Sequence, residues 1–211
     1  MSYIGSKPAN KPVVASDLDP TVITGQTALA TSPADTDEFL ISDAGVLKRL
    51  DASLVGGGGI TVADNWRLTA DVTSDTDSTG ITANLEQVDT NGQGNLGTSM
   101  SVSSGVFTFP ETGTYFIDYS AMITANGNDN VVILLYATTD NSSYSVVCKS
   151  FAGASANNLI NAHCNTLLNV TNTSNVKVKF SVSSLNSGST LMGDTSVTET
   201  GFVFIRLGDS T

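Results

Sequence analysis

Few side chains in this sequence are of types that could carry out catalysis. His163 is the only histidine, and it falls on the polar side of an alternating segment. It is the one residue that could serve as the general base of a Ser-His-Asp triad, and this position does not support such a triad. We therefore expect His163 to lie at a surface or an interface. The alternative is a metal site formed by three copies of His163 around a threefold axis. The sequence predicts a protein that is not an enzyme and that needs no cofactor.

Cys148 and Cys164 are the only cysteines. Both fall at core-facing positions of expected strands, so we expect free, buried thiols. A disulfide between them would require the two strands to be adjacent in the fold. Two cysteines form neither a disulfide framework nor a zinc site with a recognisable spacing.

Residues 71–77 form an acidic loop that contains three aspartates. Oxygen-rich loops can hold calcium. The spacing does not match an EF-hand, so a solvated loop is the preferred interpretation and calcium binding is left open. The glycines at 56–59 lack the Lys-Ser/Thr pair that follows in a phosphate-binding loop.

The formal net charge of the chain is −11. Such a chain repels the phosphates of nucleic acids and of anionic membrane surfaces, so we expect no nucleic-acid partner. No apolar run approaches the ~20 residues of a membrane helix, and residues 1–8 lack the apolar core of a secretory signal. We expect no membrane insertion, and folding in a cytosol.

From residue 60 onward the hydrophobic pattern is that of β-strands. Residues 160–170 and 176–183 alternate between apolar and polar positions, and residues 115–123 place apolar side chains on one face, as half-buried strands do. Residues 131–136 are continuously apolar, and residues 202–207 carry apolar side chains on both faces, which predicts strands covered on both faces. Turn sequences separate these segments. The predicted fold class is all-β, with an antiparallel jelly-roll β-sandwich over residues 60–211.

Residues 1–59 have the composition of an extended N-terminal anchoring arm. They contain four of the five prolines, which disfavour continuous helix and interior strands, and they end in a glycine hinge at 56–59. Two short apolar runs flank an Asp-x-Gly turn, which predicts a β-hairpin over 38–50. A lone hairpin is only marginally stable, so we expect it to rest on a partner. The apolar anchors would be Phe39, Leu40, Ile41, Val46 and Leu47.

Two segments of the predicted sandwich resemble a known superfamily. Residues 105–116, GVFTFPETGTYF, are similar to the G-x-F-x-x-P-x-x-G-x-Y stretch of the tumour necrosis factor and complement globular-head superfamily. Residues 200–207, TGFVFIRL, are similar to its last strand, which runs through the trimer core. The resemblance covers roughly residues 64–208 and implies a jelly roll that forms a homotrimer.

A final strand that is apolar on both faces would also agree with a trimer. Packing that strand around a threefold axis would cover its second face. The candidate residues for the trimer interface are Tyr115, Tyr119, Phe202 and Phe204. The alternative is that these four side chains fill only the core of one chain.

Shorter segments resemble virion proteins of tailed bacteriophages, especially tail-fibre-like and head-decorating ones. They are residues 1–5 (MSYIG), 37–43 (DEFLISD) and 64–69 (DNWRLT). The resemblance implies a homotrimer whose arm is bound to the particle and whose jelly roll faces outward.

These resemblances together predict a structural protein of a phage particle. It would be a trimeric surface decoration, cement or fibre-like protein, anchored by its arm to other virion proteins of the capsid or the tail. Its location would be the virion, after assembly in the host cytoplasm. The alternative is a host-receptor- or glycan-binding tip of a tail fibre, which would present loops such as 124–130 and 153–158 to the host surface. The sequence leaves head and tail locations equally open.

Overall fold

The structure is a computed structural model that describes residues 24–25, 27, 29, 31, 33–34, 36–55 and 59–211. The chain divides into two compact units, Met1–Gly58 and Gly59–Thr211. The predicted arm before residue 24 and most of the predicted 56–59 hinge lie outside the described residues. No helix in the described part of the chain is long and apolar enough to cross a membrane.

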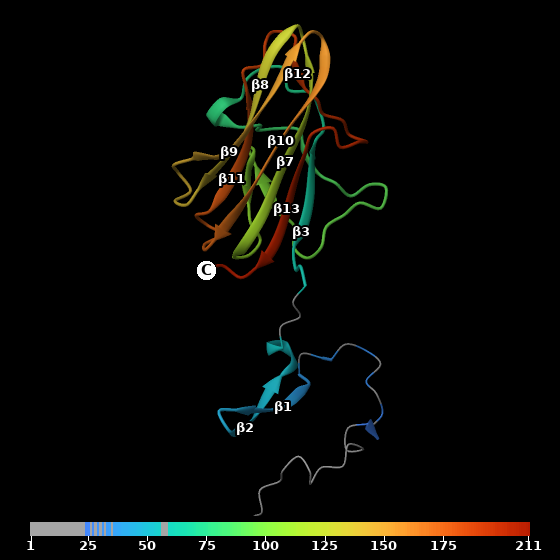
Figure 1. The fold of residues 1–211 in the computed structure, drawn as a ribbon, viewed down its shortest axis with the longest axis vertical. Coiled ribbons are helices and arrows are strands. Elements are labelled where there is room, and N and C mark those ends of the chain that lie inside the picture. Colours follow the sequence, from blue (N-terminus) through green and yellow to red (C-terminus); the bar gives the residue numbers. More distant parts are fainter. Residues whose placement is uncertain are drawn as a thin grey trace, which may run out of the picture. The chain divides into compact units, whose positions relative to one another are not determined.

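The first unit contains a two-stranded antiparallel hairpin (Figure 1). Its elements are β1 (Glu38–Asp43), β2 (Val46–Asp51) and the short 3-10 helix η2 (Ala52–Leu54). Ala44 and Gly45 form the turn, with φ angles of 51° and 83°. Two successive positive φ angles define a type I′ turn, whose twist matches that of the strands it joins. Within its described residues, this unit has no second sheet to cover the hairpin.

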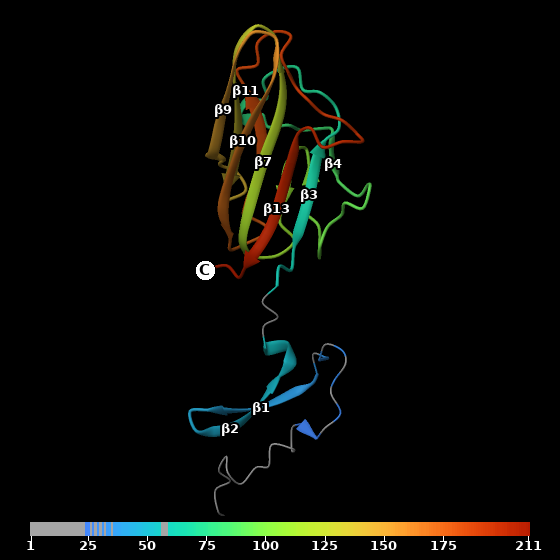
Figure 2. The same cartoon turned by 45° about the vertical axis from the view of Figure 1, so that its right-hand side comes forward.

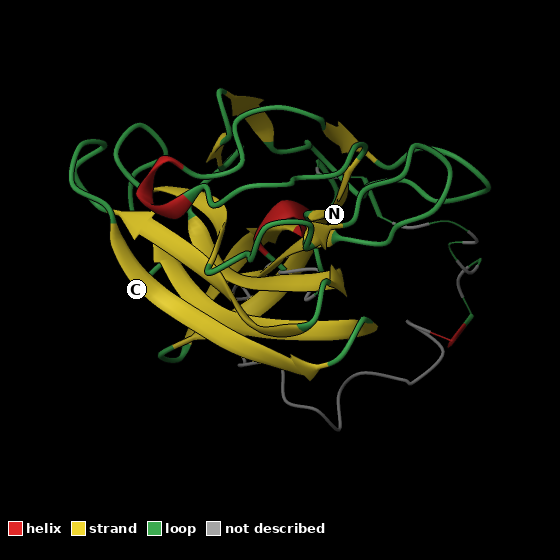
Figure 3. Ribbon diagram, turned by 90° about the horizontal axis from the view of Figure 1, so that it is seen from above, coloured by secondary structure: helices red, strands yellow, loops and turns green. Residues whose placement is uncertain are grey.

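The second unit is a sandwich of two antiparallel sheets (Figures 1 and 2). The first sheet has the order β10 (Asn158–Val170), β7 (Gly113–Ala125), β13 (Gly201–Gly208), β3 (Ala63–Leu68) and β4 (Leu85–Gln87), and β12 (Thr190–Leu191) also pairs with β7. The second sheet has the order β5 (Ser101–Ser103), β6 (Val106–Thr108), β11 (Lys177–Ser183), β8 (Asn128–Thr138) and β9 (Ser145–Ser155). Loops and the 3-10 helix η3 (Asp77–Thr79) connect the strands (Figure 3).

Side-chain alternation explains why these segments form strands. In β7 every odd-numbered residue from 113 to 125 is buried and every even-numbered one is half-buried. The buried side faces the second sheet, as expected for a pleated strand whose side chains point to opposite faces. The runs at 131–136 and 202–207 follow the same rule, since their alternate outward positions are mostly half-buried. In a single chain the outer faces of both runs are therefore only partly covered.

Aromatic rings join the two sheets in the core. Phe107 of β6 contacts four other rings, and its centroid lies 5.2 Å from that of Phe204 and 5.3 Å from that of Trp66. The centroids of Phe180 and Phe202 are 4.3 Å apart. Each such pair adds about 0.5–1.5 kcal/mol beyond the burial of its area. The rings come from both sheets, so they hold the two layers together.

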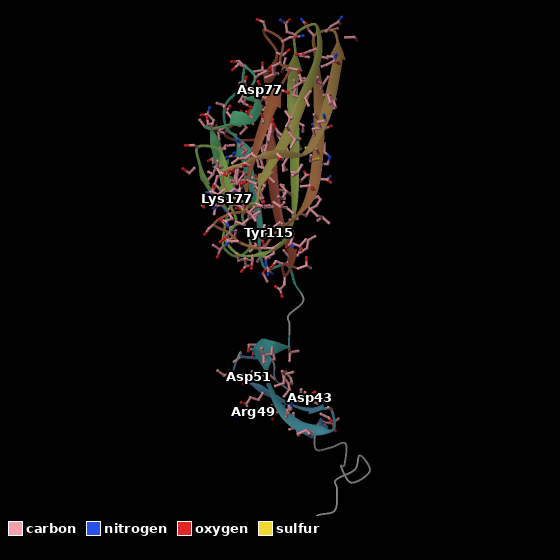
Figure 4. All side chains as sticks on the ribbon, turned by 90° about the vertical axis from the view of Figure 1, so that its left-hand side faces the viewer. Asp43, Arg49, Asp51, Asp77, Tyr115 and Lys177 are labelled. Carbon is pink, nitrogen blue, oxygen red and sulfur yellow. The ribbon has the colours of Figure 1, made fainter. Side chains whose placement is uncertain are left out.

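The four residues predicted to form a trimer interface belong to this core. Tyr115, Tyr119, Phe202 and Phe204 are each 0% exposed within a single chain, and Figure 4 shows Tyr115 inside the sandwich. The two sheets of the same chain enclose them, so they have no surface to offer to a neighbouring chain. Their assignment to the interface is wrong, and the alternative, that they fill the core of one chain, holds.

Candidate oligomer interface

Outward-facing apolar side chains form a continuous row across the first sheet. Leu167 of β10 lies opposite Phe116 of β7, which in turn lies opposite Ile205 of β13. Ile205 lies opposite Ala63 of β3. Directly opposite residues share a face and have Cβ atoms about 5 Å apart, so the four side chains are contiguous. We call Leu167, Phe116, Ile205 and Ala63 the apolar row.

The apolar row is accessible in a single chain. Leu167 is 61% exposed, and the other three side chains are half-buried. Apolar patches larger than a few hundred Å² on the surface of a soluble protein often mark an interaction site. The row therefore identifies the outer face of the first sheet as a surface suited to contact another molecule.

Further apolar side chains are exposed where the edges of the two sheets meet. β9 is the edge of one sheet and β10 is the edge of the other, and Figures 1 and 2 show them along the same side of the sandwich. Phe151 of β9 is 64% exposed and Leu159 of β10 is 65% exposed. Lys149 holds its ammonium group 5.4 Å from the centre of the Phe151 ring, a cation–π contact. Phe151 lies opposite Val132 on the outer face of the second sheet, and Leu159 lies opposite Thr124, at the far end of β10 from Leu167. Both side chains are therefore separate from the apolar row.

His163 lies on the same outer face, beside the apolar row. Its Nε2 atom is hydrogen-bonded to Asp118 of β7, and its side chain is 50% exposed. Ser120 lies opposite His163 in the ladder, but no hydrogen bond joins the two in the described structure. In a catalytic triad the Nε2 atom of the histidine faces the serine hydroxyl, whereas here Nε2 of His163 is hydrogen-bonded to Asp118. The arrangement is a polar cluster on an open sheet surface and has no catalytic geometry.

The hairpin of the first unit exposes several of the predicted anchors. Phe39, Leu40 and Val46 are 41%, 76% and 58% exposed, and Ile41 is half-buried. The side chain of Leu47 lies outside the described residues. The register places Phe39, Ile41 and Val46 on one face and Leu40 on the other. Their role as anchors stays a prediction.

Two ion pairs join the strands of this hairpin. Arg49 pairs with Glu38 over 2.9 Å on the face of Leu40, and Lys48 pairs with Asp43 on the opposite face. All four charged side chains are at least two-fifths exposed, so each pair contributes little to stability. Figure 4 shows Asp43, Arg49 and Asp51 on this element.

Two of the three aspartates of the 71–77 loop accept hydrogen bonds from backbone amides. An Asp71 carboxylate oxygen accepts from the Gly193 amide over 3.0 Å, and one of Asp75 accepts from the Leu185 amide over 2.7 Å. These bonds tie the loop to residues 185–193. No group of three or more His, Cys, Asp or Glu side chains among the described residues is arranged to hold a metal ion.

Three polar loops meet at one end of the sandwich. The Gly127 amide donates to the Asn157 side chain over 2.6 Å, and the Asn126 side chain donates to the Ser187 carbonyl over 2.8 Å. Within this unit the three loops lie at the end opposite the C-terminus (Figures 1 and 2). Both loops named above as candidates for host contact, 124–130 and 153–158, belong to this tip.

Comparisons with known proteins identify the fold. No protein-family model matches the chain, and no curated protein matches it. Among solved structures, Eiger TNF from S. frugiperda is 9% identical, with a TM-score of 0.54 over 72% of this chain and 96% of that one. The sandwich is a jelly roll of the tumour necrosis factor type. Murine APRIL is also similar, at 8% identity and a TM-score of 0.49 over 69% of this chain and 98% of that one.

The tumour-necrosis-factor-type jelly roll confirms the predicted all-β fold class. Identities this low show a shared fold and leave function to be argued from the surface of this chain. The sequence missed Phe116, Ile205 and Leu167 as surface residues. The sequence does carry a signal for them, because 202–207 has apolar side chains at both odd and even positions. Either face of this strand was therefore a candidate interface, and the predicted one was the inner face.

Proposed function

We propose that this protein is a non-enzymatic structural subunit that forms a homotrimer through the outer face of its first sheet. The apolar row is the observation that carries this proposal. Tumour-necrosis-factor-type jelly rolls are trimeric, and a threefold arrangement would cover the row in all three chains at once.

We further propose that the hairpin anchors the trimer to a larger particle, which we infer to be a phage virion. The hairpin is a two-stranded element with exposed apolar side chains, and such elements are rarely stable alone. The resemblance of residues 37–43 to phage virion proteins supports this kind of partner. Three hairpins in one trimer would convert a weak contact into a strong one through avidity.

Light scattering on the full chain tests the trimer. We expect the wild-type protein to have three times the mass of one chain. Ile205→Asp should give a folded monomer, because three carboxylates would be buried without partners. Val46→Asp is the control, since it places the same charge on an exposed apolar position of the hairpin and should leave the trimer intact. A monomeric wild-type protein would refute the trimer.

Co-sedimentation with particles tests the anchor. When the chain is produced together with the other virion proteins, the wild-type protein should sediment with the particles. Leu40→Asp combined with Val46→Asp should remain a trimer in the supernatant. If this double variant still sediments with the particles, the hairpin is not the anchor.

The tip of the sandwich supports a second candidate, a host-receptor- or glycan-binding role. Its three loops converge and are rich in asparagine, serine and glycine, which offer hydrogen-bond donors and acceptors to a sugar. Asn186 belongs to the same tip, where its side chain donates to the Asn128 carbonyl over 2.6 Å. Asn157→Ala combined with Asn186→Ala should reduce adsorption to host cells without loss of particle incorporation. Unchanged adsorption would exclude this role for the tip.

A further inference from the structure

The two cysteines approach each other across the sandwich. Cys148 belongs to β9 and Cys164 to β10, which are edge strands of different sheets and lie against each other. Cys148 stands opposite Leu135 and Cys164 opposite Tyr119, and both of those partners belong to the core. Both thiols therefore point into the space between the sheets.

The Cys148 sulfur reaches the strand that carries the other thiol. Its Sγ donates to the backbone carbonyl of Asn165, the residue after Cys164, over 3.2 Å. Burial raises the pKa of the Cys164 thiol, and hydrogen bonding with the Cys148 side chain raises it further. Both cysteines are free in the structure. Cys164 is only 5% exposed, whereas Cys148 is half-buried, so solvent reaches Cys148 more easily.

We propose that Cys148 and Cys164 form a reversible disulfide that links the two sheets at their common edge. The oxidant would be a small-molecule disulfide such as oxidised glutathione. The Cys148 thiolate attacks one sulfur of the oxidant, giving a mixed disulfide and releasing one thiolate. The Cys164 thiol then loses its proton and attacks the Cys148 sulfur, which releases the second thiolate. The protein loses two protons and two electrons, and the oxidant is reduced to two thiols.

The position of this bond gives it a structural consequence. It would close a loop of about 16 residues, and loops of this size give a substantial stabilisation when crosslinked. The bond would also fix β9 against β10, the strands that carry Phe151 and Leu159. Oxidation would thereby hold the edge of the sandwich in one arrangement. This inference does not depend on the proposed function, because it concerns bonds within one chain.

Oxidation of the full-length protein with oxidised glutathione tests the proposal. We expect the intact mass to fall by two hydrogens, and thiol titration in denaturant to fall from two groups to none. Proteolysis without reductant should yield a peptide pair joined through Cys148 and Cys164. We also expect the midpoint of thermal unfolding to rise by about 5–10 °C, and reductant to reverse the rise.

Two variants serve as controls. Cys148→Ser changes the more exposed cysteine and should fold normally, yet show no rise in the unfolding temperature on oxidation. Cys164→Ser should retain glutathione on Cys148, because the second thiol is missing. A wild-type protein that retains glutathione, forms crosslinked dimers or does not react would overturn the proposal.

Discussion

The two faces of the first sheet are built from consecutive residues and have different roles. Tyr115 is fully buried and Phe116 beside it is half-buried, and the same holds for Phe204 and Ile205. The inner face packs on the second sheet through aromatic rings, whereas the outer face presents the apolar row. The inner face thus determines that the chain folds, and the outer face determines what the folded chain can contact.

The largest expected effect comes from truncating the inner face. Phe202→Ala should lower the free energy of unfolding by roughly 3–5 kcal/mol, because it opens a cavity among the core rings. Phe116→Ala, on the outer face, should cost less than about 1 kcal/mol in the monomer. Urea unfolding of both variants in the Ile205→Asp background measures the difference without the contribution of assembly. Equal losses would contradict the distinction between the faces.

A turn residue should have the next largest effect, because it sets which side of β6 faces inward. Gly105 has a φ of 76°, and a Cβ there would lie 2.2 Å from the Ile81 carbonyl oxygen. Gly105→Ala should cost roughly 2–3 kcal/mol, since the β5–β6 turn must shift and Phe107 depends on its register. Gly45→Ala is the matched control. Its φ is 83° with no atom within 4 Å, so we expect about 1 kcal/mol.

Deprotonation should weaken the inner face at alkaline pH. Burial raises the pKa of Tyr119, and burial followed by the charge of Glu111 raises the pKa of Tyr115 to about 12. A raised pKa in the folded state means that stability is fully present below the unfolded pKa of about 10 and is lost as the pH rises through about 12. Urea midpoints measured between these values should fall steeply.

A variant without the Tyr119 hydroxyl separates the contribution of Tyr119 to this alkaline loss of stability from that of Tyr115. The hydroxyl donates to the Ser181 carbonyl over 3.3 Å, so Tyr119→Phe should cost about 1 kcal/mol at neutral pH. The same variant should lose less stability at alkaline pH than the wild-type protein. A fall as steep as that of the wild-type protein would show that Tyr119 does not contribute.

The smallest effect should come from the polar cluster on the outer face. His163→Ala removes a half-exposed contact with Asp118 and should change the free energy of unfolding by less than about 0.5 kcal/mol. Thermal unfolding of the monomeric Ile205→Asp background measures it. A loss above about 2 kcal/mol would show that His163 supports the sheet itself.

The sequence was sufficient to predict the fold class but not the surface. Alternation in 160–170 and 176–183 predicts strands, and the turn sequence at 140–142 marks the reversal of chain direction between β8 and β9. The choice between the two faces of 202–207 depends on pairing with β3 and β7, which are remote in sequence. Successive residues of a strand point to opposite faces, so a shift of one residue replaces Phe202 and Phe204 by Val203 and Ile205 on a given face. The predicted interface therefore consists of side chains that the structure places inside the core.

The cysteines illustrate the same limit. Their core-facing positions followed from alternation, and the structure agrees on both strands. Their proximity did not follow, because β9 and β10 belong to different sheets and only the closed sandwich brings the two edges together. Local periodicity therefore predicts which way a side chain points but not which residue it meets.

The pairing of β3 with β13 has a consequence for how the chain is made. Trp66 of β3 lies opposite Phe202 of β13. β3 is one of the first strands of the sandwich to be synthesised, and it cannot form this pairing until β13, the last strand, has been synthesised. At a synthesis rate of about 5–20 residues per second, this delay is on the order of ten seconds. Such long-range pairing also slows folding after release. Until β13 pairs with it, that edge of β3 has unpaired backbone groups. Chaperones or neighbouring nascent chains can bind this edge most readily during that interval.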